Sequence, residues 1–109
     1  MELLQGTLHL FILKALSWGP RHGYEISRWI RTTSAEPLNI EEGALYPALH
    51  RLEERRLVES EWGLTKEGRR AKYYQLTRAG RDQLRRLTSD WNRYTAMAAR
   101  ILTADKGSS

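Results

Sequence analysis

The last third of the chain limits the possible folds more than any other part, because its apolar residues have the spacing of a helix–helix interface. They are separated by alternating steps of three and four residues, at Leu84, Leu87, Trp91, Tyr94, Ala98 and Ile101. This heptad seam covers about two and a half repeats and is typical of helices that pair with each other. The sequence predicts a long helix over residues 78–104, capped by Thr77, with a second copy of the chain as its partner. The tail, residues 105–109, is expected to be frayed.

The N-terminal segment, residues 3–18, is also expected to form a helix, because its apolar residues keep helical spacing and do not alternate. Nearly every side of it is apolar, and the Gly-Pro pair at 19–20 ends it. A helix that is apolar all round is buried from more than one direction. In a chain of 109 residues, part of that burial is expected to come from the second copy. The predicted dimer interface therefore adds Leu4, Leu8 and Phe11 to the six seam residues.

Two shorter helices are predicted between these segments. Residues 22–30 and 42–55 each carry an apolar stripe at helical spacing, formed by Ile26, Trp29 and Ile30 in the first and by Leu45, Leu49 and Leu52 in the second. Residues 32–37 are expected to form the linker between them. Pro47 lies inside the third helix and cannot donate a backbone hydrogen bond. Regular hydrogen bonding is therefore expected to start just upstream of Pro47, after a loosened first turn.

The pattern then changes to that of strands. Residues 57–62 and 71–76 contain β-branched and aromatic residues in partial alternation. Between them, residues 63–70 hold two glycines and the cations Lys66, Arg69 and Arg70. This predicts a β-hairpin over about 58–76, called the wing below, whose basic tip is longer than a two-residue turn.

Some residues are expected to serve packing alone. Trp18, Trp29 and Trp62 are assigned to the core or to packing against the strands. Gly80 is expected to let the long helix pass close to the hairpin, because a glycine inside a helix costs about 1 kcal/mol relative to alanine.

Three helices, a hairpin with a basic tip and a long final helix are the elements of a winged helix-turn-helix with a dimerisation arm. The predicted fold is therefore mainly α with a small β-hairpin (α+β), with a DNA-binding domain over 1–77 and a dimerisation helix over 78–104. A helix fits the major groove of B-form DNA, about 12 Å wide, so the third helix is expected there. The cations of the wing would neutralise phosphates of the flanking backbone. A net charge of +5, doubled in a dimer, favours a polyanionic partner.

Composition argues against several other classes of function. The chain has no cysteine, and His9, His22 and His50 lack metal-ligand spacing. It has no phosphate-binding Gly-rich loop, no HExxH motif and no convincing Ser/His/Asp set, so neither an enzyme nor a cofactor is expected. The N-terminus lacks the positive region of a signal peptide, and its apolar run is too short to cross a bilayer, so a cytoplasmic protein without a membrane partner is expected. RNA is disfavoured, because the major groove of A-form RNA is narrow.

Four motifs carry a resemblance to a known family. In order along the chain they are LQGTL (residues 4–8), HGY (22–24), EGALYPALHRLE (42–53) and RAKYYQLTRAG (70–80). From residue 3 to about residue 102, the chain resembles the PadR family of bacterial transcriptional regulators, most of which are repressors. The single helix after the wing resembles the smaller PadR subfamily. Ala44 stands where many members carry Ser or Thr, so one hydroxyl that could meet a phosphate is missing.

The residues expected to contact DNA come mainly from the third helix and the wing. Tyr46, His50 and Arg51 lie off the apolar stripe of the third helix, which leaves their side chains either available to DNA or simply solvated. The resemblance favours Tyr46 most, as a contact to phosphate or sugar. Arg70 and Lys72 either bind phosphates or support the hairpin. The full set of predicted DNA contacts is Tyr24, Asn39, Ala44, Tyr46, Pro47, His50, Arg51, Lys66, Arg69, Arg70 and Lys72.

Trp91, in the centre of the seam, has two candidate roles. It is either a hydrophobic anchor of the dimer or, as the resemblance to PadR proteins that sense drugs or phenolic compounds implies, one wall of a pocket for a planar aromatic effector. Such a pocket would be completed by Leu8, Phe11, Leu87 and Tyr94. The sequence thus predicts a homodimeric, sequence-specific repressor that binds an inverted-repeat operator in double-stranded DNA and is released by a small molecule. The alternative is a winged helix used for protein–protein contact, which a neutral or acidic wing would favour.

Overall fold

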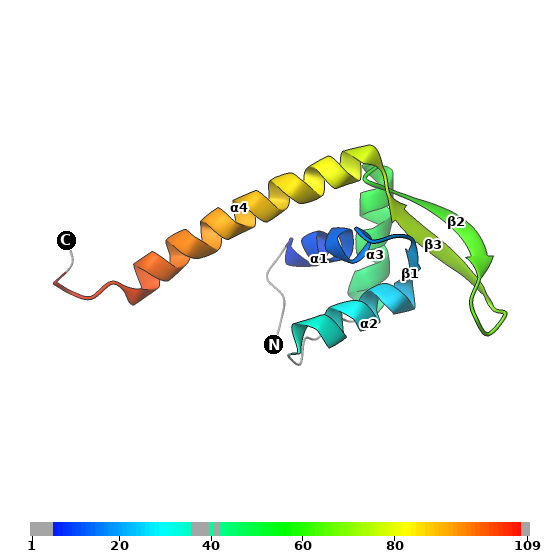
Figure 1. Cartoon of the computed structure of the whole chain (residues 1–109), viewed down its shortest axis with the longest axis horizontal. Coiled ribbons are helices and arrows are strands. Elements are labelled where there is room, and N and C mark those ends of the chain that lie inside the picture. The colour runs from blue at the N-terminus through cyan, green and yellow to red at the C-terminus, as the bar shows by residue number, and fades with distance from the viewer. Residues whose placement is uncertain (1–5, 36–39, 41, 108–109) are drawn as a thin grey trace.

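The computed structural model describes residues 6–35, 40 and 42–107. Within these residues the elements follow the order α1 (Thr7–Ala15), β1 (Arg21–His22), α2 (Gly23–Ser34), α3 (Glu42–Glu54), β2 (Val58–Leu64), β3 (Arg70–Leu76) and α4 (Arg78–Thr103). The first three helices form a compact body, from which the wing extends to one side and α4 to the other (Figure 1). The α+β architecture with a long final helix confirms the predicted fold class.

The core lies between α1, α2, α3 and the inner end of the sheet. Ile12, Leu49 and Leu52 have no exposed surface, and Val58 and Tyr74 close the core from the sheet. The apolar stripes predicted for the second and third helices both point into it, at Ile26, Ile30, Leu45, Leu49 and Leu52. Helical periodicity therefore located the buried faces correctly.

The first helix is shorter than predicted. It begins at Thr7, after Gly6 in the left-handed conformation (φ 84°), and it ends at Ala15 instead of Trp18. Residues 16–19 continue as turns, in which Ser17 N–H donates to the Lys14 carbonyl and Gly19 N–H donates to the Leu16 carbonyl. The predicted interface residue Leu4 lies outside the described residues.

The second helix is longer than predicted, so the linker expected over 32–37 was wrong in its first part. Helix α2 continues to Ser34 and ends at Ala35, which has a left-handed φ of 55°. One contact along this helix is the 2.7 Å hydrogen bond that Arg31 Nη1 donates to Ser27 Oγ, one turn earlier. A side-chain contact between residues one turn apart stabilises a helix, which matters here because the residues at the end of α2 have modest helix propensity.

The third helix matches its predicted range, but its first turn is not loosened as expected. Helix α3 is continuous from Glu42, with Pro47 as its sixth residue. The proline lacks the N–H that would bond the carbonyl of Gly43. Because both residues are exposed, water can satisfy that carbonyl.

The sheet contains one strand that the sequence did not predict. Within the described residues it has three strands in the order β1-β3-β2, and β1 pairs with β3 through Arg21↔Tyr74 and His22↔Tyr73. The predicted hairpin of β2 and β3 is present, in antiparallel register from Val58↔Leu76 to Leu64↔Arg70. The strands extend two residues further than expected in β2 and one in β3, so the tip shortens from residues 63–70 to residues 65–69.

One residue, Thr77, joins the wing to the long helix. Its N–H donates to the Leu57 carbonyl (3.1 Å), and its hydroxyl donates to the Arg56 carbonyl (2.7 Å) and accepts from Gly80 N–H (3.0 Å). Gly80 lies so close to this loop that a Cβ there would sit 1.9 Å from the Leu57 carbonyl oxygen. The predicted cap and the predicted reason for a glycine are both confirmed.

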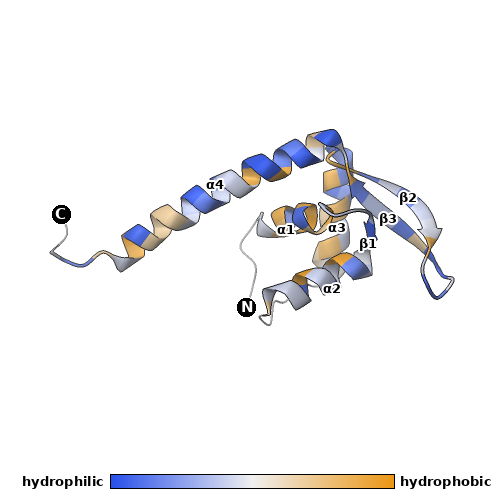
Figure 2. Cartoon of the chain, in the orientation of Figure 1, coloured by the Kyte–Doolittle hydropathy of each residue, from blue (hydrophilic) through white to orange (hydrophobic). Residues whose placement is uncertain are grey.

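The heptad seam of α4 divides into two parts. Leu84 and Leu87 pack, with Leu8 and Phe11, against the core of their own chain. Farther along, Tyr94 is 55% exposed and Ile101 64% exposed. Figure 2 shows hydrophobic residues recurring along α4 to its far end, well beyond the body. No helix in the described ranges is both long and apolar enough to cross a membrane.

The prediction for the tryptophans was right for one and wrong for two. Trp29 packs against the core, whereas Trp18 is 63% exposed and Trp62 is 60% exposed. Trp18 lies in the turn after the shortened α1, with its ring centroid 5.4 Å from that of Trp29. Trp62 lies on the outer half of β2, beyond the part of the sheet that covers the core.

Candidate nucleic-acid interface

A groove of about 470 Å³ separates the wing from the start of α2 and from α3. Six of the predicted DNA contacts line it: Tyr24, Tyr46, His50, Arg69, Arg70 and Lys72. The fold thus brings together residues from three elements that are distant in the sequence. A groove with aromatic, imidazole and cationic walls suits a polyanion with stacked bases.

The remaining predicted contacts lie elsewhere. Ala44, Pro47 and Arg51 are exposed on α3 but do not line the groove, and Lys66 is exposed at the wing tip. Asn39 lies outside the described residues. Arg51 and Arg55 are near His9 of α1, where their positive charges help to lower the pKa of that imidazole, although burial is the larger cause. Arg51 is therefore on the flank of α3 that faces α1.

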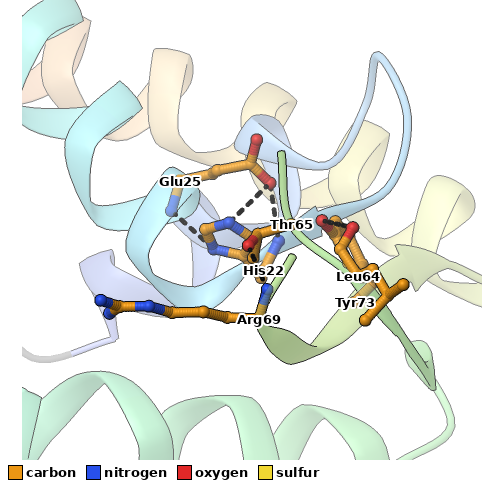
Figure 3. A network of polar contacts seen from close by, with 6 residues as sticks. All are labelled: His22, Glu25, Leu64, Thr65, Arg69 and Tyr73. Atoms are coloured by element: carbon orange, nitrogen blue, oxygen red, sulfur yellow. Dashed lines mark hydrogen bonds and ion pairs between the residues drawn. The ribbon is translucent and has the colours of Figure 1, made fainter. Parts of the chain in front are cut away.

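The start of α2 is held by a reciprocal cap (Figure 3). His22 N–H donates to Glu25 Oε1 (3.1 Å), and Glu25 N–H donates to His22 Nδ1 (3.3 Å). The His22 ring also meets the edge of Tyr73, with centroids 5.3 Å apart. These contacts tie the start of α2 to β3 and fix the backbone from which exposed Tyr24 projects into the groove.

The wing tip is a tight turn. Thr65 N–H donates to the Arg69 carbonyl (2.8 Å), and the Thr65 hydroxyl accepts from Arg69 N–H (3.1 Å), as Figure 3 shows. Gly68 has a φ of 81°, a conformation that favours glycine. Lys66 and Arg69 are both exposed at this tip, and the hydrogen bonds with Thr65 fix the backbone of Arg69.

The two faces of the wing carry opposite charges. The register places Trp62, Leu64, Arg70 and Lys72 on one face, which we call the groove face, in line with buried Val58 and Tyr74. Alternation places Glu59 and Glu61 on the reverse face. An anionic partner is therefore favoured on the groove face and repelled from the other.

Lys72 has a structural partner. Its Nζ lies 3.6 Å from Glu53 Oε1 of α3, and the Glu53 carboxylate also accepts a 2.5 Å hydrogen bond from the Ser60 hydroxyl. These contacts join α3 to both strands of the wing. Nearby, burial raises the pKa of the Tyr74 hydroxyl, with Glu53 and Tyr46 adding to the effect, so it stays protonated. The contact between Lys72 and Glu53 therefore supports the structural role of Lys72, which is one of the two roles considered for it.

Sequence reasoning missed six residues that line the groove, and three of them have side chains that can contact a ligand there. His22, Trp62 and Thr65 line it together with the predicted contacts. His22 belongs to the HGY motif, which could have identified it. Trp62 has no such signal, because a strand pattern does not say how far the core reaches beneath it.

Comparisons with known proteins identify the family. The profile of the transcriptional regulator PadR-like family matches residues 12–86, which span α1 to the first turns of α4. The chain belongs to the PadR-like family. It is therefore a DNA-binding transcriptional regulator and not an enzyme, as predicted.

Other PadR proteins share both sequence and fold. A PadR-like transcriptional regulator from Bacillus cereus is 27% identical, with a TM-score of 0.80, over 94% of this chain and 97% of that one. A PadR family regulator from Clostridium difficile is 30% identical, with a TM-score of 0.78, over 89% and 99%. An uncharacterized protein of Lysinibacillus sphaericus is 32% identical over 90 residues, 83% of each chain. The matches to the two PadR structures cover most of the chain, and therefore extend beyond the body.

Proposed function

We propose that this PadR-family regulator is a homodimeric, sequence-specific repressor of an inverted-repeat operator. Helix α3 of each copy would lie in a major groove, and the wing would lie on the backbone beside it. The observation that carries this is the groove between α3 and the wing, where Tyr46 and His50 face Arg69 and Arg70. Such a regulator acts on the chromosome and is expected in the cytoplasm.

The proposed dimer rests on α4. Along this helix, the stripe that packs against the body at Leu84 and Leu87 continues through half-buried Trp91 to exposed Ile101. A second copy related by a two-fold axis would cover this outer part with the same residues, which is the usual form of a symmetric interface. The two α3 helices would then meet half-sites about one or two helical turns apart.

The effector proposal rests on aromatic residues at the point where the seam leaves the body. The ring centroids of Trp91 and Tyr94 are 6.2 Å apart, with their planes inclined by 31°. In a dimer, this pair and its symmetry mate would flank the apolar residues Leu8, Phe11 and Leu87. A planar aromatic molecule stacked there would change the angle between the two DNA-binding bodies. This molecule would release repression only to the extent that it binds the released arrangement of the dimer more tightly than the DNA-bound one.

The decisive experiment is fluorescence anisotropy with DNA from upstream of the protein's own gene. The control is scrambled DNA of equal length, and both are titrated across a salt series. A preference on the order of a thousandfold for the upstream DNA, with both affinities falling as salt rises, is expected. Equal and weak binding to upstream, other promoter and scrambled duplexes would contradict sequence-specific repression and favour a winged helix that binds a protein.

A further inference from the structure

Trp62 is an exposed aromatic residue in the middle of the groove face. It is 60% exposed, and Leu64, two residues on, is 68% exposed. The same face is buried further inward, at Val58 and Tyr74, so Trp62 is not needed to cover the core. Large apolar side chains that project side by side from a soluble domain commonly mark a contact surface.

Trp62 also orients a cation. The guanidinium carbon of Arg70, which is diagonally opposite on β3, lies 4.9 Å from the centroid of the Trp62 ring. A cation stacked on an indole face is held by the ring quadrupole and keeps its hydrogen-bond donors available at its edge. The charge of Arg70 therefore has a fixed place beside an apolar surface.

The partner that fits this pair is anionic. Trp62 and Arg70 line the groove opposite Tyr46 and His50 of α3, whereas Glu59 and Glu61 lie on the reverse face of the wing. The edge of a DNA duplex offers phosphates beside apolar deoxyribose rings. It matches a guanidinium beside an indole more closely than a protein surface of mixed charge does.

Resting on the proposed DNA-binding function, we infer that Trp62 and Arg70 form one composite DNA contact. The indole packs against deoxyribose at the edge of the duplex next to the site of α3, and it holds the guanidinium of Arg70 against a phosphate. Trp62 is thus both a contact and a positioning residue. The contact is to the backbone, so it acts on DNA of any sequence.

The first test compares two tryptophans of similar exposure, Trp62 and Trp18. Trp62→Ala is expected to weaken binding to a mixed-sequence duplex at low salt by on the order of tenfold. Trp18→Ala, which removes a tryptophan 63% exposed outside the groove, is expected to leave it unchanged. Trp62→Phe should bind DNA almost as tightly as the wild type, which would show that the loss in Trp62→Ala comes from the missing ring and not from misfolding. Equal affinities for all three variants and the wild type would overturn the inference.

Salt dependence separates the two halves of the pair. Arg70→Gln is expected to flatten the slope of log affinity against log salt by about 0.9, because one phosphate is no longer neutralised by the protein. Trp62→Ala is expected to lower the affinity and to flatten the slope less than Arg70→Gln does, because Arg70 keeps its charge but loses its support. Since the residues act together, the double variant should lose less than the two single losses combined. Full additivity would overturn the positioning role of Trp62.

A direct readout is the ¹⁹F spectrum of protein labelled with 5-fluorotryptophan, in which Trp62→Phe assigns one resonance. That resonance is expected to shift on saturation with the mixed-sequence duplex, and an unmoved resonance would overturn the inference. The proposed repressor function can fail separately, because it requires a preference for one operator. Backbone contact by Trp62 requires only that the wild-type protein binds duplex DNA.

Discussion

The ring of Tyr46 lies directly against the α-carbon of Gly23, so a residue of α3 occupies the space of the missing side chain at the start of α2. A Cβ at Gly23 would be 2.7 Å from the Tyr46 hydroxyl oxygen and 2.9 Å from two ring carbons. The contact sets the distance between the two helices at the mouth of the groove. It also gives Tyr46 a packing role beside its proposed contact with DNA.

Gly23→Ala is therefore expected to push the Tyr46 ring out of place. The ring is the far end of a side chain and can swing away, so the loss of unfolding free energy should be modest, about 1 kcal/mol. DNA affinity should fall more, because Tyr46 would leave its position in the groove. Urea unfolding and anisotropy measure the two effects. In a Tyr46→Ala background the substitution should be harmless, and Gly43→Ala, where a Cβ meets nothing within 4 Å, is the matched control.

Gly80→Ala is expected to destabilise the protein strongly. The added Cβ would meet the Leu57 carbonyl oxygen at 1.9 Å, and a backbone atom cannot swing aside as the end of a side chain can. The start of α4 would have to move, at a cost of about 3 kcal/mol. Thermal unfolding measures the loss. Ala79→Ser, one residue earlier on the exposed side of α4, should stay within about 0.5 kcal/mol of the wild type, and an equal loss there would refute the packing explanation.

His9 is expected to make the fold less stable in mild acid. Burial lowers the pKa of its imidazole below the ordinary value of 6.5, and Arg51 and Arg55 lower it further. The unfolded chain therefore takes up the proton first as the pH falls. The unfolding free energy should be highest above pH 6.5 and should decline as the pH falls below that value. It should level off once the pH is below the pKa of His9 in the folded protein. Denaturation of wild type and His9→Gln from about pH 8 to about pH 5 isolates this contribution, and identical pH profiles would contradict it.

The wing-tip cations are expected to bind DNA without reading its sequence. Replacing Lys66 and Arg69 together by glutamine should weaken binding to every duplex and flatten the salt slope by about 0.9 for each phosphate that the wing no longer neutralises. Stability should change little, because both side chains are exposed. Anisotropy with operator and scrambled DNA across a salt series measures this. A weakening confined to the operator would mean that the wing contacts base edges.

Trp91→Ala is expected to weaken the dimer. A buried tryptophan at the centre of an interface can contribute about 2 kcal/mol or more, so dissociation should become on the order of thirtyfold easier. Sedimentation equilibrium over a dilution series measures this. Asn92→Ala, on the neighbouring exposed position of α4, should leave assembly unchanged. A Trp91→Ala protein that dimerises as tightly as wild type would place the interface elsewhere.

Features specified by local chemistry were predictable from the sequence. Thr77 is a residue type that caps helices, and Gly80 is a residue type that allows close packing, so both roles could be predicted. The stripes at Ile26 and Leu49 follow from helical periodicity. Strand β1 has only two residues and exists because β3 pairs with it, so no local pattern could reveal it. Six of the predicted DNA contacts line one groove, because the fold brings α2, α3 and the wing together.

The errors for the two tryptophans Trp18 and Trp62 have a common physical origin, because each depended on where the core ends. Trp62 alternates correctly for a half-buried strand, yet the body beneath β2 ends before it. Trp18 was placed in a helix that ends at Ala15, where the turn carries it outward. Periodicity says which face of an element is apolar but not how much of its length is covered.

The junction at Thr77 connects the wing rigidly to α4. Residue 76 ends β3 and residue 78 begins α4, and the N–H and hydroxyl of Thr77 between them are held by hydrogen bonds to the backbone of Arg56, Leu57 and Gly80. No flexible linker therefore separates the wing from α4, the helix that would pair with a second copy in the proposed dimer. In the proposed dimer, a rotation of α4 would therefore also rotate the wing, and the spacing of the two DNA half-sites would depend on how the two α4 helices pair.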